Sequence, residues 1–151
     1  MATLYEWAGG TEALTRLIDA FYDRVESDDL LSPFFPGEVT AEHRDHVIAW
    51  WAEVFGGPAR YTDELGGYAH MLAKHRDLAI TAEHRFRFAS LMSLAADDAG
   101  LPADPEFRSA LVAYLEWGTR LAMENSQPGA AVVEHAPVPR WGWGEAPPYQ
   151  P

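Results

Sequence analysis

Apolar side chains recur every three or four residues in the first part of the chain, and this spacing constrains the fold more than any other feature. The residues that follow it are Leu14, Leu17, Ile18, Phe21, Tyr22 and Val25. They form one wide apolar face of an α-helix, which has to be buried against other elements. Tyr22 belongs to this face, so its hydroxyl enters the interior and needs either a backbone carbonyl or a ligand as its partner.

Capping and breaking residues divide the chain into further helices. Gly9-Gly10 is a break, after which Thr11 is the expected cap of the first long helix. Thr40 is expected to cap the next helix, and Gly56-Gly57-Pro58 to end it. The side chains expected to face inward from that helix are His43, Val47, Trp50 or Trp51, and Val54.

The second half of the chain repeats this pattern. Residues 56–67 are expected to form a loop, followed by a short helix that carries His75. Thr81 is the expected cap of another helix, and Asp104-Pro105-Glu106 is a strong start signal for the last one. The apolar residues expected on one face of these two helices are Phe88, Leu91, Met92 and Ala95, then Phe107, Leu111, Tyr114, Leu115, Leu121 and Ala122. No stretch alternates with period two, so we predict an all-α fold.

Composition limits the functional class. A chain of 151 residues, 48% of them apolar, is expected to form one globular domain. Its formal net charge of −12 argues against nucleic acid or an anionic membrane as a partner. It has no cysteine, which excludes disulfides, thiolate zinc sites and cysteine nucleophiles. The chain has no apolar run of membrane-spanning length, and residues 1–7 lack the order of a signal peptide, so we expect a soluble, cytoplasmic protein.

The character of the chain changes after residue 126. Six of the 11 prolines lie between Pro128 and Pro151, around the sequence Trp141-Gly142-Trp143-Gly144. Such a segment does not form a regular element. We therefore predict a globular domain over residues 1–126 and an irregular extension over residues 127–151. The two tryptophans either dock on the domain or a partner, or belong to a disordered tail.

A histidine near the middle of the chain is a candidate metal ligand. His75 lies between Lys74, the only lysine, and Arg76; Met71 and Leu72 precede it. A neutral imidazole in an apolar wall is a ready ligand for haem iron, and the adjacent cations would suit an acidic cofactor. The alternative is an ordinary core or surface histidine.

Two further features could contribute to a site. Pro33-Phe34-Phe35-Pro36 is a tight corner that drives aromatic rings inward, where they would serve as a wall against a flat cofactor or as core packing. His43 and Val47 share one helix face. His46 lies three residues after His43, and such a pair could bind zinc, although no third strong ligand follows the same pattern.

The ordered set of these signals resembles the truncated haemoglobin family over about residues 5 to 125. The features that carry the resemblance are Gly9-Gly10, Phe21-Tyr22, Pro33-Phe34-Phe35-Pro36, Gly56-Gly57-Pro58 with Tyr61, the lone His75, and the helix that begins near Thr81. The Gly-Gly-Pro-x-x-Tyr segment is most similar to the group II branch. The Arg-rich, Lys-poor usage and the Trp-Gly-Trp-Gly tail look actinobacterial.

The resemblance implies a two-over-two helical sandwich around one haem b. It implies His75 as the proximal iron ligand, and Tyr22 as the distal hydroxyl that faces a bound gas. His43 and Val47 would lie on the distal helix over the iron. The residues implied around the cofactor are Phe35 on the porphyrin, Met71 in the wall, and Tyr61, Lys74, Arg76 and Arg60 near the propionates.

The chain departs from the group II pattern at two positions. Group II members usually have a tryptophan where Phe88 stands, so the N–H donor that would reach the ligand is missing. The distal position is often small in group II, whereas here it is His43, which is more similar to group III. These departures bear on the hydrogen bonds to the ligand. They also raise the question of whether His43 itself binds the iron when no gas is present.

The implied function is the binding of O₂, NO, CO or peroxide at haem iron. Donors at Tyr22 and His43 predict tight O₂ binding, which suits redox chemistry such as NO dioxygenation or peroxide reduction better than transport. We find no dinucleotide fingerprint, so turnover would need an external reductase. A monomer or a homodimer is expected. Two alternatives stay open: a non-haem metal protein, and a cofactor-free globin-like interaction module whose aromatic core fills the haem site.

Overall fold

The computed structural model of the protein describes residues 2–144. Within these residues the chain forms helices and turns and contains no β-strand. The helices are α1 (Leu4–Ala8), α2 (Gly10–Glu26), the 3-10 helix η1 (Ser32–Phe34), α3 (Ala41–Val54), α4 (Arg60–Glu64), α5 (Gly67–His75), α6 (Ala82–Asp98) and α7 (Pro105–Asn125). The all-α prediction is confirmed.

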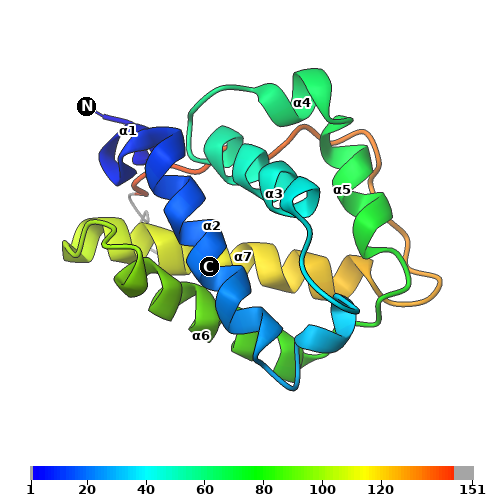
Figure 1. Ribbon diagram of the computed structural model, residues 1–151. Helices are drawn as coiled ribbons and strands as arrows, with labels where there is room; N and C mark the ends of the chain where they lie inside the picture. The colour runs from blue at the N-terminus through cyan, green and yellow to red at the C-terminus, as the bar shows by residue number, and fades with distance from the viewer. Residues whose placement is uncertain (1, 145–151) are drawn as a thin grey trace, which may run out of the picture.

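Two pairs of helices are stacked on each other. Helix α2 packs against α3, and α6 packs against α7, while the contact between α2 and α6 joins the two pairs (Figure 1). Helices α4 and α5 lie at the end of this stack, where α5 contacts α7. This is the two-over-two helical sandwich expected from the sequence.

The caps predicted for three helices are confirmed. The Thr40 and Thr81 hydroxyls accept hydrogen bonds from the backbone N–H groups of the third residues of α3 and α6, and the Asp104 carboxylate does the same for α7. The cap predicted at Thr11 is wrong. Gly9 takes the left-handed conformation (φ 112°), so α1 ends at Ala8 and α2 already begins at Gly10.

The loop expected over residues 56–67 is also wrong in part, because it contains α4. No side chain next to α4 in the sequence caps it. Its Thr62 N–H instead donates to the carboxylate of Glu53, which is buried at the end of α3 (2.8 Å from N to Oε1). This cap comes from another helix, so the local sequence carried no sign of it.

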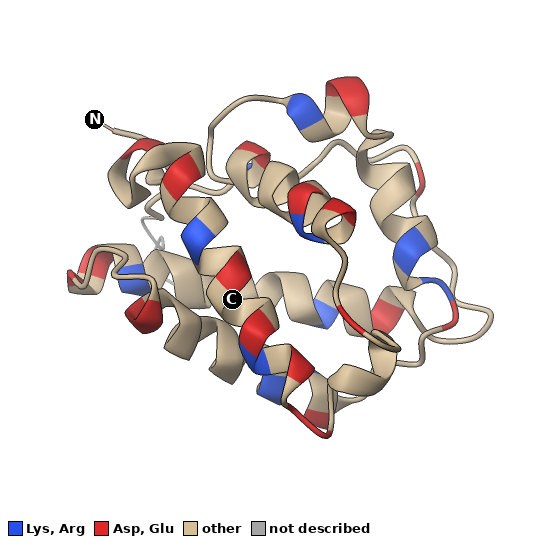
Figure 2. Cartoon of the chain, viewed as in Figure 1, with Lys and Arg blue, Asp and Glu red and all other residues tan. Residues whose placement is uncertain are grey.

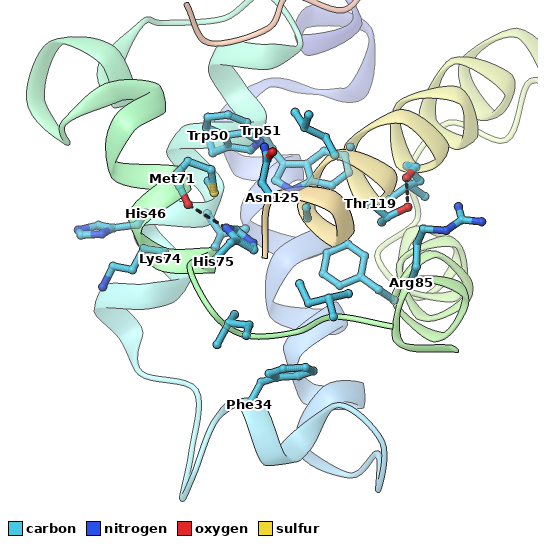
Figure 3. A pocket seen from close by; sticks show the side chains of 18 of the residues that line it. Phe34, His46, Trp50, Trp51, Met71, Lys74, His75, Arg85, Thr119 and Asn125 are labelled. Carbon is cyan, nitrogen blue, oxygen red and sulfur yellow. Dashed lines mark hydrogen bonds between the residues drawn. The ribbon is translucent and has the colours of Figure 1, made fainter. Parts of the chain in front are cut away.

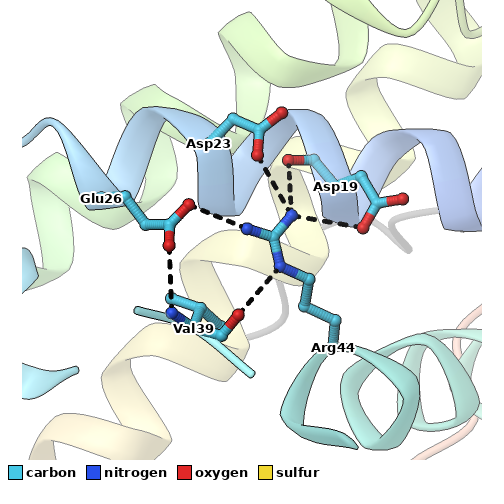
Figure 4. Close-up of polar contacts among 5 residues, drawn as sticks. All are labelled: Asp19, Asp23, Glu26, Val39 and Arg44. Carbon is cyan, nitrogen blue, oxygen red and sulfur yellow. Dashed lines mark hydrogen bonds and ion pairs between the residues drawn. The ribbon is translucent and has the colours of Figure 1, made fainter. Parts of the chain in front are cut away.

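An arginine next to His43 joins α3 to α2. The Arg44 guanidinium donates to the carboxylates of Asp19, Asp23 and Glu26 and to two backbone carbonyl oxygens (Figure 4). Acidic residues recur along this exposed side of α2 (Figure 2). Arg44 therefore lets α3 approach an acidic surface and fixes the start of α3 against the helix that carries Tyr22.

The irregular tail docks on the domain. After α7 it passes α5 and α3 and reaches α1 (Figure 1). The Trp141 backbone N–H donates to the carbonyl oxygen of Val54 (2.8 Å), and the Trp143 indole N–H donates to that of Ala2 (2.8 Å). Of the two alternatives left open for the tryptophans, the structure shows docking on the domain. Residues 145–151 of the predicted extension lie outside the described residues.

Candidate functional site

A large cavity lies between α2, α3, α5, α6 and α7, with a volume of about 230 Å³ (Figure 3). Folded cores are packed densely and leave few voids larger than a water molecule. A cavity of this size in a mainly apolar lining is therefore built for an occupant. It also argues against the alternative in which the aromatic core fills the site.

Tyr22 and His43 form a polar pair in the wall of this cavity. The Tyr22 hydroxyl and the His43 Nε2 lie 3.0 Å apart, so α2 and α3 bring together two residues that are 21 positions apart in the sequence. Tyr22 is 3% exposed, and Phe35 packs edge-on against both rings. The partner required by the buried Tyr22 hydroxyl is thus a side chain of the site and not a backbone carbonyl.

Burial sets the protonation of the pair. It raises the pKa of Tyr22 far above its ordinary value, so the hydroxyl keeps its proton. Burial, together with the positive charge of Lys74, lowers the pKa of His43, so the ring is neutral at pH 7. The pair is therefore a neutral hydroxyl and a neutral imidazole that share one hydrogen bond. When the His43 Nε2–H is the donor of that bond, the Tyr22 hydroxyl proton is free to point into the cavity.

His75 is the last residue of α5, and its ring lines the cavity (Figure 3). Its Nδ1 lies 2.8 Å from the carbonyl oxygen of Met71. Because a carbonyl oxygen only accepts, Nδ1 carries the proton. Burial lowers the pKa of His75, so the ring is neutral and Nε2 keeps its lone pair. This arrangement is typical of histidines that bind a metal through Nε2.

The structure brings most of the residues named from the sequence to this one cavity. Its lining includes Tyr22, Phe35, His43, Val47, Tyr61, Met71, Lys74, His75 and Phe88. Phe88 contacts the ring of Phe21 and contributes no N–H donor. Tyr61 is 2% exposed, and burial raises its pKa to about 12.

Two cations named from the sequence lie elsewhere. Arg76 follows α5 and lies 3.6 Å from Glu134 of the tail, with its side chain mostly exposed. Arg60 forms ion pairs with Asp45 and Glu64. Neither lines the cavity, because acidic partners outside hold both guanidinium groups.

Sequence reasoning missed one polar residue of the cavity and gave another a different role. His46 was considered only as a zinc partner of His43, yet its ring faces that of His70 (6.0 Å between centroids), and both line the cavity near Lys74. The His70 Nε2 is buried and has no hydrogen-bond partner among the described residues. Buried polar atoms of this kind are normally hydrogen-bonded to the protein, to water or to a ligand. The only signal in the sequence was the spacing of His70 and Lys74 on one helix face.

The alternative of a non-haem metal protein gains no support. In residues 2–144, no three histidine, aspartate or glutamate side chains are grouped so that they could hold a metal ion. None of the helices described is long and apolar enough to cross a membrane.

The fold and the cavity define a class of protein: a two-over-two helical sandwich around an apolar pocket with one neutral histidine and a tyrosine–histidine pair. Comparison with known proteins agrees. The model of the family described as bacterial-like globin matches residues 3–119. The group 2 truncated haemoglobin YjbI of Bacillus subtilis is 37% identical over 118 residues, which cover 78% of this chain and 86% of that protein.

Solved structures give the same result. The truncated oxygen-avid haemoglobin of Bacillus subtilis superposes with a TM-score of 0.70 at 34% identity, covering 80% of this chain and 98% of the other. A thermostable haemoglobin from the actinobacterium Thermobifida fusca gives 0.70 at 31% identity, covering 81% and 97%. The chain therefore belongs to the bacterial-like globins and is a haem-binding, gas-binding globin of the truncated type. The resemblance to group II is confirmed.

Proposed function

We propose that the cavity holds haem b, with its iron bound by His75, and that Tyr22 and His43 hold O₂ tightly for redox chemistry rather than for transport. The observation that carries this proposal is the state of His75. Its Nδ1–H is engaged by the Met71 carbonyl, and a neutral Nε2 is left in an apolar cavity that also contains the Tyr22–His43 pair.

The cavity fits the chemistry of a haem. A porphyrin is flat and mostly apolar, which suits a lining of phenylalanine, valine and methionine side chains. Its two propionates need donors at one edge. The unpartnered Nε2 of His70 supplies one, and the His46 ring and Lys74 lie near it. Figure 3 shows His46 and Lys74 on the same side of the cavity. We assign the propionates to these three residues rather than to Arg60 or Arg76.

A ferrous haem held by His75 would supply O₂ binding with charge shifted toward the oxygen atoms. The Tyr22 hydroxyl keeps its proton because it is buried, so it can donate to a bound ligand, while the His43 N–H either supports the hydroxyl or donates as well. A neutral hydrogen bond contributes about 1 kcal/mol net, so two of them would slow the loss of O₂ about ten-fold or more. The description of the Bacillus subtilis relative as oxygen-avid supports tight binding.

Tight binding favours turnover of the bound gas over its release. The reactions in view are NO dioxygenation and peroxide reduction, and in the second His43 would carry the proton. Both consume electrons, so an external reductase belongs to the proposal. We also propose a cytoplasmic location, which suits a chain without cysteine.

The test is the O₂ dissociation rate of the Tyr22→Phe variant, measured by stopped-flow displacement with CO. We expect an increase of about five- to ten-fold, because one hydrogen bond is lost. Tyr61→Phe is the matched control. It removes a hydroxyl from a tyrosine that lines the same cavity but contacts Trp50 and His70, and we expect the parent rate. An unchanged rate in Tyr22→Phe would refute the assignment.

A further inference from the structure

The cavity wall between α3 and α7 is closed by side chains and not by direct packing of the helices. Helix α3 packs on α2 and α4, whereas α7 packs on α6, α5 and α1. Across the gap, the Trp50 indole N–H donates to the Tyr114 hydroxyl (2.7 Å), and Trp51 packs edge-on against the Tyr114 ring. Both Trp50 and Tyr114 line the cavity. The wall therefore depends on where Tyr114 is held.

One residue of the tail touches both helices and Tyr114. The Trp141 backbone N–H donates to the carbonyl oxygen of Val54, the last residue of α3 (2.8 Å). Its indole N–H donates to the carbonyl oxygen of Ala110, in α7 (3.2 Å). Its ring packs edge-on against that of Tyr114, with centroids 5.6 Å apart. Trp141 does not line the cavity, so it acts from outside the wall.

Several rings contact Tyr114. Trp51 and Phe55 do so from the α3 segment and Trp117 from α7 itself, while Trp141 does so from the tail. Tyr114 is 5% exposed. Trp141 is half-buried, and removal of its ring would take away one contact of the Tyr114 ring and the hydrogen bond to α7.

We propose that Trp141 is a positioning residue of the haem pocket: from outside the wall it ties α3 to α7 and presses Tyr114 toward Trp50. The tail lies outside residues 3–119, which match the globin family model. The proposal concerns the wall itself, and only its haem readout rests on the proposed function.

The first test measures hydrogen exchange of the Trp50 indole N–H by NMR in the CO-bound protein. This N–H is buried in the wall and reports its opening directly. We expect exchange to be about ten-fold or more faster in Trp141→Ala. Trp143→Ala is the matched control: Trp143 also belongs to the tail and donates its indole N–H to a backbone carbonyl, but its ring contacts Trp7 and Phe107, away from the wall. We expect the parent exchange rate there.

The second test is the rate of haem transfer to an excess of apomyoglobin, well below the melting temperature of each variant. We expect Trp141→Ala to lose haem several-fold faster than Trp143→Ala. Equal effects of the two variants on both rates would overturn the proposal, because they would show that the tail stabilises the whole domain. Parent-like rates in Trp141→Ala would overturn it as well.

A milder variant covers the case in which Trp141→Ala does not fold. Trp141→Phe keeps the backbone hydrogen bond to Val54 and a ring against Tyr114 but loses the hydrogen bond to Ala110. We therefore expect an exchange rate of the Trp50 indole N–H between those of the parent and Trp141→Ala. A parent exchange rate would refute the bridge to α7. The absence of a Soret band in the parent protein would show that the proposed function is wrong. The exchange rates of the variants could then still be compared in the haem-free protein, so the role of Trp141 is tested separately.

Discussion

Replacing Arg44 by methionine should both destabilise the fold and loosen the ligand pair. Methionine keeps a long apolar side chain but removes the guanidinium that joins α3 to α2 (Figure 4). Three carboxylates and two carbonyl oxygens then lose their donor at once. His43 directly precedes Arg44, so the change acts on the start of the helix that holds the imidazole against Tyr22.

The size of the effect follows from the exposure of each partner. The Arg44 side chain is 16% exposed, and Glu26 is its most buried acidic partner at 31%, so we assign that bond about 1 kcal/mol. Asp19 and Asp23 are 51% and 70% exposed and are worth about 0.3 kcal/mol each. If each of the two carbonyl bonds adds about 0.5 kcal/mol, the total loss is about 2.6 kcal/mol, or about 5–10 °C in Tm for a chain of this length.

The assay is thermal unfolding of the CO-bound protein, with the O₂ dissociation rate measured in parallel. Arg24→Met is the control, because Arg24 forms an ion pair with Asp98 at the surface, where screening leaves little stability to lose. We expect Arg44→Met to lower Tm clearly more than Arg24→Met and to speed O₂ loss a few-fold. Equal Tm values for the two variants would refute the reasoning from burial.

Three further predictions concern the cavity. Burial lowers the pKa of His43 below 6.5, so acidification below that pH leaves both of its ring nitrogens protonated. Its Nε2–H can then only donate to Tyr22, which frees the hydroxyl proton for the ligand. O₂ dissociation should therefore slow as pH falls, and His43→Leu should abolish this dependence; an acid-accelerated rate in the parent would contradict it. His70→Phe should lose haem several-fold faster in a transfer assay, whereas a parent rate would show that its orphaned Nε2 does not serve a propionate. Phe88→Trp should slow O₂ loss about five-fold through one new donor, at a cost of about 1–3 kcal/mol in stability against Phe21; an unchanged rate would mean that the indole does not reach the ligand.

The residues that sequence reasoning placed well are those fixed by local rules. The apolar face around Phe21 and the caps at Thr40, Thr81 and Asp104 depend on spacing within one helix, and the structure confirms them. The cap predicted at Thr11 was wrong because α2 begins at Gly10, directly after Gly9 in the left-handed conformation. Thr11 is therefore already inside the helix.

The features that escaped prediction are those set by tertiary contacts. Helix α4 starts on the Glu53 carboxylate from another helix, and the position of Arg44 is decided by acids 18 to 25 residues earlier in the chain. Periodicity cannot reveal that His46 and His70 meet, because they lie on different helices. The docking of Trp141 likewise depends on two backbone carbonyls that only the folded chain brings together.

The most direct measurement is the resonance Raman spectrum of the ferrous, ligand-free protein in the region of the iron–histidine stretch. If His75 supplies the bond to iron, the band is present in the parent, disappears in His75→Gly, and returns when free imidazole is added to that variant. A band that persists in His75→Gly without imidazole would show that another side chain holds the iron.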